Sequence, residues 1–144
     1  ADFFSVSGVP ETGVKYLQAL DNLNHTHEYG VAFERGTALD LPLGRHLLIS
    51  GTASIDCLGQ CVYRGDAVRQ TERLVENIDA LLRDGDAELA DMQYMVCYLR
   101  DLADYPAVKA CLQKLLPDVP CLMTLARVCR PEWLVEIEGI AVRR

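Results

Sequence analysis

The closing segment of the chain, Cys129 to Val142, reads CRPEWLVEIEGIAV and carries two carboxylates inside an otherwise apolar run. Successive side chains of a β-strand point to opposite faces, so Leu134, Glu136 and Glu138 share one face with Ile140 and Val142. The opposite face is apolar or small throughout: Trp133, Val135, Ile137, Gly139 and Ala141. This alternation predicts a sheet with one core face and one face that meets solvent, a ligand or a partner subunit.

Composition narrows the class of protein. A chain of 144 residues, half of them hydrophobic, is long enough for one domain with a core and too apolar to be disordered. Its net charge of −7 works against nucleic-acid binding, which draws on Lys and Arg neutralising phosphates. No run approaches the roughly 18 to 20 apolar residues that span a bilayer, and no basic region followed by an apolar run opens the chain. We therefore expect a globular, cytoplasmic protein without a membrane partner.

The cysteines and histidines do not form a recognisable metal motif. Cys57 and Cys61 lie four apart in DCLGQC, and the other four cysteines are scattered without CxxC units. Reduced thiols fit this pattern better than a redox pair of Cys57 and Cys61. His25 and His27 bracket Thr26 without a companion ligand pattern, which favours surface histidines over a metal site.

Two helices are predicted. Asp66 is a candidate N-cap, a helical stripe of apolar residues and Thr71 continues to Leu82, and Gly85 is a stop signal. Gln70 and Asn77 lie on or near that stripe, where we expect their amides to bond neighbouring backbone groups. A second helix is expected to begin near Asp104, with Pro106 in its first turn and Pro117 at its end.

The remaining segments predict strands. We expect them over residues 29–36, 46–56, 62–63, 92–100, 121–131 and 133–142, with a turn around Pro42 and Gly44. Residues 92–100 are apolar on both faces apart from Gln93, as in a central strand. Residues 1–29 are interpreted as an extension of uncertain structure, in which Val14–Leu23 could form a short helix. The sum is an α+β sheet with helices on one face.

Four fragments, in this order along the chain, resemble the RidA/YjgF (Rid) family. They are HLLISGTASID at 46–56, GDAVRQTERLVENIDALL at 65–82, VCYLRDLADYPAV at 96–108 and VEIEGIAVRR at 135–144. The resemblance implies a chorismate-mutase-like α+β fold over residues 30–144, with a mixed β-sheet and two helices packed on one face. It also implies a homotrimer with ligand clefts between subunits, and activity without a metal or cofactor.

Members of this family hydrolyse enamines and imines released by pyridoxal-phosphate enzymes, and their carboxylate-gripping Arg follows Pro and a small residue. Here the motif is Pro120, Cys121, Leu122, and leucine cannot make a bidentate contact. Arg127 is an odd number of residues further on, which would put it on the opposite strand face. The family's N-terminal tyrosine is replaced by Thr37, or by Phe33 under a shifted gap.

Glu136 matches the acidic residue that borders the family's cleft. Such a carboxyl could act as general acid or base if its pKa were raised, and the alternative is a structural glutamate bonded to a neighbouring strand or subunit. We expect Glu138 to interact with backbone or solvent.

A second resemblance adds an alternative chemistry. The segments AFERGTALDL and CRPEWLVEIEG look like the C-terminal part of chorismatases, longer enzymes that cleave the enolpyruvyl ether of chorismate. In that group a glutamate at the position of Glu136 protonates the enolpyruvyl methylene, and the residue at the position of Cys129 shapes the outcome.

Three hypotheses follow. The first is a hydrolase or deaminase that binds a small carboxylate metabolite in an intersubunit cleft. Glu136 would be its acid or base, and its lining would be drawn from Leu122, Thr124, Cys129, Ser50, Gly51, Thr37 and Phe33. The second is a noncatalytic metabolite-binding or interaction trimer, suggested by Leu122. The third is an endoribonuclease, which the acidic balance disfavours.

Overall fold

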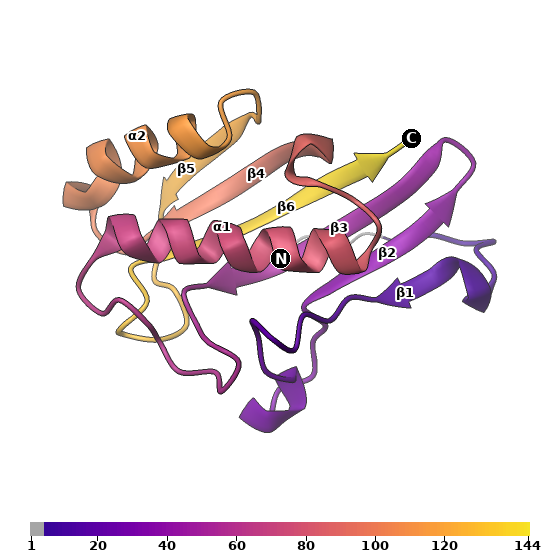
Figure 1. The fold of residues 1–144 in the computed structure, drawn as a ribbon, viewed down its shortest axis with the longest axis horizontal. Helices are drawn as coiled ribbons and strands as arrows, with labels where there is room; N and C mark the ends of the chain where they lie inside the picture. The colour runs from indigo at the N-terminus through magenta and orange to yellow at the C-terminus, as the bar shows by residue number, and fades with distance from the viewer. Residues whose placement is uncertain (1–4) are drawn as a thin grey trace.

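The structure, a computed structural model, describes residues 5–144. Over these residues a six-stranded sheet has the strand order β1-β2-β3-β6-β4-β5, and two α-helices lie on one of its faces (Figure 1). The bounds along the chain are β1 Val14–Tyr16, β2 Gly36–Leu41, β3 Gly44–Ala53, α1 Ala67–Asp84, β4 Met92–Leu99, α2 Tyr105–Leu115, β5 Cys121–Leu125 and β6 Val135–Arg143. Short 3-10 turns occupy Glu11–Gly13, Thr26–Tyr29, Leu89–Asp91 and Leu102–Asp104.

The sheet is mixed. β4 and β5 run parallel because α2 connects them as a crossover, and the other neighbouring strands pair antiparallel. The predicted α+β class, with a mixed sheet and two helices on one face, is confirmed.

The first helix forms where its signals predict it. The Asp66 side chain accepts a hydrogen bond from the Arg69 backbone N–H at 3.0 Å, and Gly85 follows the last turn. The predicted stripe is buried from Ala67 to Leu82, and it packs α1 against β3 and β6. The second helix also agrees with its prediction, since α2 begins at Tyr105, carries Pro106 in its first turn and ends before Pro117.

The predicted alternation in the closing strand is confirmed. Val135, Ile137, Gly139 and Ala141 are buried toward the helices, and the residues between them on β6 are half-buried. We call the surface of the sheet that is turned away from α1 and α2 the open face. Glu136 and Glu138 lie on it.

Two strand predictions near the first hairpin are wrong. The strand predicted over 29–36 begins only at Gly36, because register with β3 starts at the Gly36–Ile49 pair and continues to the turn at Pro42 and Leu43. The strand predicted at Val62 and Tyr63 is replaced by an isolated bridge between Ile55 and Cys61. Tyr63 has a φ of 58°, which is incompatible with an extended strand.

The helix considered for Val14–Leu23 is also wrong. Residues 14–16 form β1, which pairs with β2, and the fully buried Leu17 joins the core together with Leu23. Lys15 donates hydrogen bonds to the backbone carbonyl and the carboxylate of Asp84 at the end of α1. These contacts favour an extended strand over a local helix. The boundary between residues 29 and 30 itself stays a prediction.

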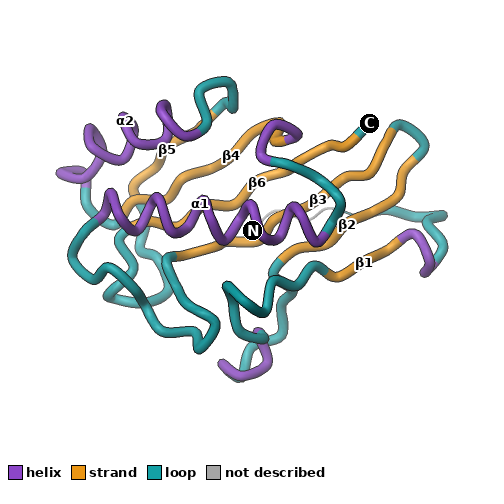
Figure 2. Tube along the Cα trace, viewed as in Figure 1, coloured by secondary structure: helices purple, strands orange, loops and turns teal. Residues whose placement is uncertain are grey.

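The penultimate strand is shorter than predicted. β5 ends at Leu125, and residues 126–134 form a loop, which we call the rim loop. In Figure 2 several loops lie beside the first turn of α1, and the rim loop is at this end of the sheet. Arg127 is in the rim loop, so the strand-face argument against it is wrong.

Candidate active site on the open face

The candidate site centres on Glu136 in β6. Glu136 is paired with Ala53 of β3 on one side and with Tyr98 of β4 on the other. Tyr98 is in turn paired with Thr124 of β5. Directly paired residues project to the same face, so Glu136, Tyr98 and Thr124 form a row across the open face, with Thr124 about 10 Å from Glu136 at ~4.8 Å per strand.

The Glu136 carboxyl is half-buried and incompletely bonded. Its Oε2 is buried and has no hydrogen-bond partner among the described residues. Burial raises the pKa of Glu136 above its ordinary value, the negative charge of Glu138 raises it further, and the backbone N–H of Cys129 partly lowers it. A carboxyl with these neighbours holds its proton to higher pH than an exposed glutamate does.

Gly51 makes room for this carboxyl. The register between β3 and β6 shifts between Ile49 and Thr52, which marks a bulge that contains Ser50 and Gly51. A Cβ on residue 51 would overlap Oε1 of Glu136. The glycine therefore lets the carboxyl lie directly over the backbone of β3.

The rim loop is fastened to the sheet and to α1. Arg100, just after β4, donates hydrogen bonds to the carbonyls of Val128 at 2.9 Å and Trp133 at 2.8 Å, and also to that of Arg130. The fully buried Gln70 of α1 donates to the carbonyl of Glu132 at 3.0 Å and accepts from the Leu134 N–H at 2.9 Å. These bonds hold Cys129, whose side chain is exposed, at the rim beside Glu136.

The predicted role of the buried amides is confirmed. Besides the Gln70 bonds, the Asn77 amide donates to the carbonyls of Ala53 and Ile55, each at 3.1 Å. Both side chains bond the backbone of segments next to the candidate site.

Tyr98 and Glu138 form a pair that sequence reasoning missed. The Tyr98 hydroxyl donates to Glu138 Oε1 at 2.6 Å, so the expectation that Glu138 interacts with backbone or solvent is wrong. Alternation within MQYMVCYLR places Tyr98 on a face with Tyr94 and Val96, but nothing in the sequence states that β4 lies beside β6. Arg100 was missed for the same reason.

Leu122 and Thr124 lie on β5 with exposed side chains, on the open face. Leu122 is paired with Val96, which is itself paired with Glu138, and it is 65% exposed. A leucine in that place contacts solvent rather than the core, and it offers a ligand no charge or hydrogen bond.

The three remaining predicted residues lie farther from the carboxyl. Ser50 donates from its hydroxyl to the Glu34 carbonyl at 2.6 Å, which ties the segment before β2 to the bulge. Phe33 in that segment is exposed, and the Arg35 guanidinium lies 5.6 Å from its ring centroid. Thr37 belongs to the row of Leu48 and Ile140, which lies four residues along β6 from Glu136, or about 14 Å at ~3.4 Å per residue. Thr37 is therefore not beside the carboxyl.

Over residues 5–144 no group of three or more His, Cys, Asp or Glu side chains is arranged to hold an ion. His25 and His27 stack with ring centroids 5.0 Å apart, and all six cysteines are free thiols. Neither helix in this part of the chain is long and apolar enough to cross a membrane.

Known proteins share this sequence and this fold. Over 99 residues the chain is 31% identical to the 3-aminoacrylate deaminase RutC of Acinetobacter baylyi. This match covers 65% of this chain and 75% of that protein. Over 111 residues it is 32% identical to the 3-hydroxybenzoate synthase of Streptomyces hygroscopicus, which covers 69% of this chain. The match covers 32% of the synthase, so the chain spans about a third of that relative's length.

Solved structures of related proteins share the fold of this chain. A chorismatase matches with a TM-score of 0.77 at 25% identity, over 90% of this chain and 44% of the chorismatase chain. The YjgF gene product of E. coli matches with a TM-score of 0.73 at 18% identity, over 90% of this chain and 99% of its own. Residues 36–143 match the family model described as endoribonuclease L-PSP. The chain therefore belongs to the RidA/YjgF family.

Proposed function

We propose that the open face around Glu136 binds a small carboxylate metabolite that contains an enolpyruvyl ether or an enamine, and that Glu136 is the general acid that starts its hydrolysis. The observation that carries the proposal is the buried Oε2 of Glu136, which has no partner among the described residues. A buried polar atom without a partner is costly in a purely structural side chain, and a ligand can supply the missing interaction.

The two substrate classes need the same first step. In each, the carbon–carbon double bond is electron-rich at its terminal carbon because an ether oxygen or an amine nitrogen donates electrons into it. Transfer of a proton from Glu136 to that carbon leaves a cation stabilised by the oxygen or nitrogen. Water then adds to the cationic carbon, and the carbon–oxygen or carbon–nitrogen bond breaks to give a carbonyl compound and an alcohol or ammonia.

The environment of Glu136 suits an acid of this kind. A general acid is most effective when its pKa lies near the working pH, and burial together with Glu138 moves the pKa of Glu136 in that direction. The names of two relatives, 3-aminoacrylate deaminase and chorismatase, fit the two substrate classes. 3-Aminoacrylate is itself an enamine that carries a carboxylate.

The other residues of the cleft receive their proposed roles from their positions relative to Glu136. Thr124 supplies a hydroxyl in the same row as Glu136, and Cys129 lies at the rim with the backbone of the Ser50–Gly51 bulge opposite. In the proposed homotrimer, a neighbouring copy packs against the open face and closes the cleft. Ser50 and Phe33 would then border the entrance, and Thr37 would lie outside the reacting region.

The test is turnover of chorismate, and of enamines generated in situ from amino acids, by the wild type and by Glu136→Gln. We expect the substitution to lower kcat by about 10²- to 10⁴-fold, because it removes the transferable proton while keeping shape. Glu72→Gln, on the exposed side of α1, is the control and should keep full activity. Turnover that survives Glu136→Gln would rule out this role.

A noncatalytic metabolite-binding trimer is the second candidate, and Leu122 is the observation that favours it. A 65% exposed leucine replaces the guanidinium that grips substrate in deaminating members. Under this alternative, small carboxylates bind with one-to-one stoichiometry per chain, no substrate of the panel is converted, and Leu122→Arg tightens carboxylate binding. Conversion of any of these substrates by the wild type would exclude it.

A further inference from the structure

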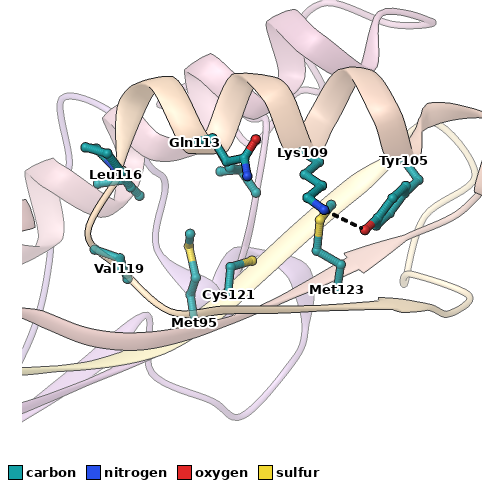
Figure 3. A pocket seen from close by; sticks show the side chains of 10 residues that line it. Met95, Tyr105, Lys109, Gln113, Leu116, Val119, Cys121 and Met123 are labelled. Atoms are coloured by element: carbon teal, nitrogen blue, oxygen red, sulfur yellow. Dashed lines mark hydrogen bonds between the residues drawn. The ribbon is translucent and has the colours of Figure 1, made fainter.

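A cavity of about 290 Å³ lies between α2 and the edge of the sheet, on the side opposite the open face (Figure 3). It exists because α2 packs mainly against α1 and buries only Val108 and Leu112 from within the helix. The helix therefore stands away from β5. The lining residues come from β4, α2, the α2–β5 connection and β5.

The body of the cavity is apolar and deformable. Met95, Cys121 and Met123 form the floor on β4 and β5, and Leu112 and Leu116 face them from the helix side. Methionine side chains have three flexible bonds and adapt to irregular ligands. Such a surface suits a hydrocarbon chain or ring better than a polar group.

The cavity is separate from the Glu136 site. Side chains alternate along β5, so Cys121 and Met123 point toward α2 whereas Leu122 and Thr124 lie on the open face. No residue proposed above to contact the substrate lines this cavity. The sheet itself separates the two sites.

The cavity opening carries a cation without a carboxylate partner. Lys109 Nζ donates to the Tyr105 hydroxyl at 3.2 Å, and both side chains line the cavity together with Gln113. None of the ion pairs among the described residues includes Lys109. The chain carries a net charge of −7, so most of its surface repels anions. The Lys109 ammonium at the end of an apolar cavity therefore favours a ligand that is apolar and carries one negative charge.

We propose that this cavity binds an amphipathic monocarboxylate, with its apolar part between α2 and β5 and its carboxylate at Lys109 and the Tyr105 hydroxyl. A cavity of ~150 Å³ accommodates benzene, so this one accommodates a ligand of about twelve non-hydrogen atoms. Octanoate fits that limit and is the probe. The proposal does not depend on the chemistry of Glu136.

The experiment is calorimetric titration of the full chain with octanoate. We expect saturable binding that Lys109→Gln weakens about tenfold, the loss of one charge-assisted contact. Lys114→Gln is the matched control, because Lys114 is an exposed lysine of the same helix that does not line the cavity. Glu136→Gln should also leave octanoate binding unchanged, which separates this site from the proposed active site.

Two further measurements place the ligand. Octanoate should slow maleimide labelling of Cys121 but not of the exposed Cys57, followed by peptide mass spectrometry. Cys121→Phe, with folding checked by thermal unfolding, should fill the cavity and abolish binding. The proposal is overturned if the wild type shows no saturable octanoate binding, or if Lys109→Gln and Lys114→Gln bind octanoate equally.

Discussion

The Glu136 carboxyl is positioned chiefly by backbone: Gly51 lies beneath it, and the Cys129 N–H approaches from the rim loop. Backbone positions are fixed by the sheet and by the loop bonds, so they lose no side-chain freedom when a ligand binds. The carboxyl thus keeps one oxygen oriented for an incoming group while the other lies over β3.

Gly51→Ala is predicted to lower activity by forcing the carboxyl away from β3. The added methyl group overlaps Oε1, and φ at this glycine is not in the left-handed region, so the cost comes from the side-chain clash alone. A double-mutant cycle with Glu136→Ala checks the cause through the free energy of unfolding. The destabilisation caused by Gly51→Ala should disappear when Glu136 is already alanine; an equal cost in both backgrounds would contradict the contact.

Glu138→Gln is predicted to move the pH–rate profile. Protonated Glu136 is the active form of a general acid, so activity falls as pH rises through its pKa. Removing the charge of Glu138 removes one cause that raises this pKa, and the fall should shift to lower pH. Glu72→Gln again serves as the reference. A profile that stays in place, or shifts to higher pH, would contradict the electrostatic coupling.

At the scale of elements, Gln70 is the residue of α1 whose side chain bonds the rim loop to the helix. Gln70→Ala is predicted to lower the free energy of unfolding by about 2–4 kcal/mol, because it leaves the Leu134 N–H without its partner and the Glu132 carbonyl with only the weak Cys61 thiol donor at 3.5 Å. Denaturant unfolding measures this, with the exposed Gln60→Ala as control. A change within about 0.5 kcal/mol of the control would show that water replaces these bonds.

The elements that the sequence predicts well carry their own signals. α1 has a cap, an apolar stripe and a glycine stop, and β6 has strict alternation. The three residues of β1 have no such signal, because their extended form depends on pairing with β2. The predicted elements from the first helix onward agree in order with α1, β4, α2, β5 and β6, whereas of the three strands predicted before that helix only 46–56 corresponds to an observed strand, β3.

The candidate site was predictable only in part. Glu136, Ser50 and Gly51 lie in contiguous motifs and were named from them, whereas the bulge at Ser50–Gly51 and the Tyr98–Glu138 bond depend on strand pairing between segments far apart in sequence. The sequence predicts a strand as far as residue 131, into the rim loop, because Val128 continues the apolar pattern of β5. Only the bonds of this loop to Arg100 and Gln70 explain why it leaves the sheet.

At the scale of the whole molecule, the open face carries apolar residues that no helix covers. Tyr94 and Leu122 are 45% and 65% exposed, and the half-buried Ile140 lies between Leu48 and Tyr94. Ile140→Lys is predicted to convert the proposed homotrimer to monomers in sedimentation velocity, because it places a charge in the subunit contact. Leu102→Lys, an exposed position outside the sheet, should stay trimeric. A monomeric wild type, or a trimeric Ile140→Lys variant, would contradict the assembly.

β1 also protects the fold against aggregation through its sheet edge. Residues Val14 to Tyr16 pair with β2. They therefore bond backbone groups of β2 that would otherwise form a free sheet edge. Free edges of this kind recruit strands from other molecules and seed aggregation. Lys15, anchored to Asp84, places a charged residue on that border. A shortened chain that lost β1 would keep the Glu136 site, yet it would expose the longer β2 as a template for intermolecular pairing.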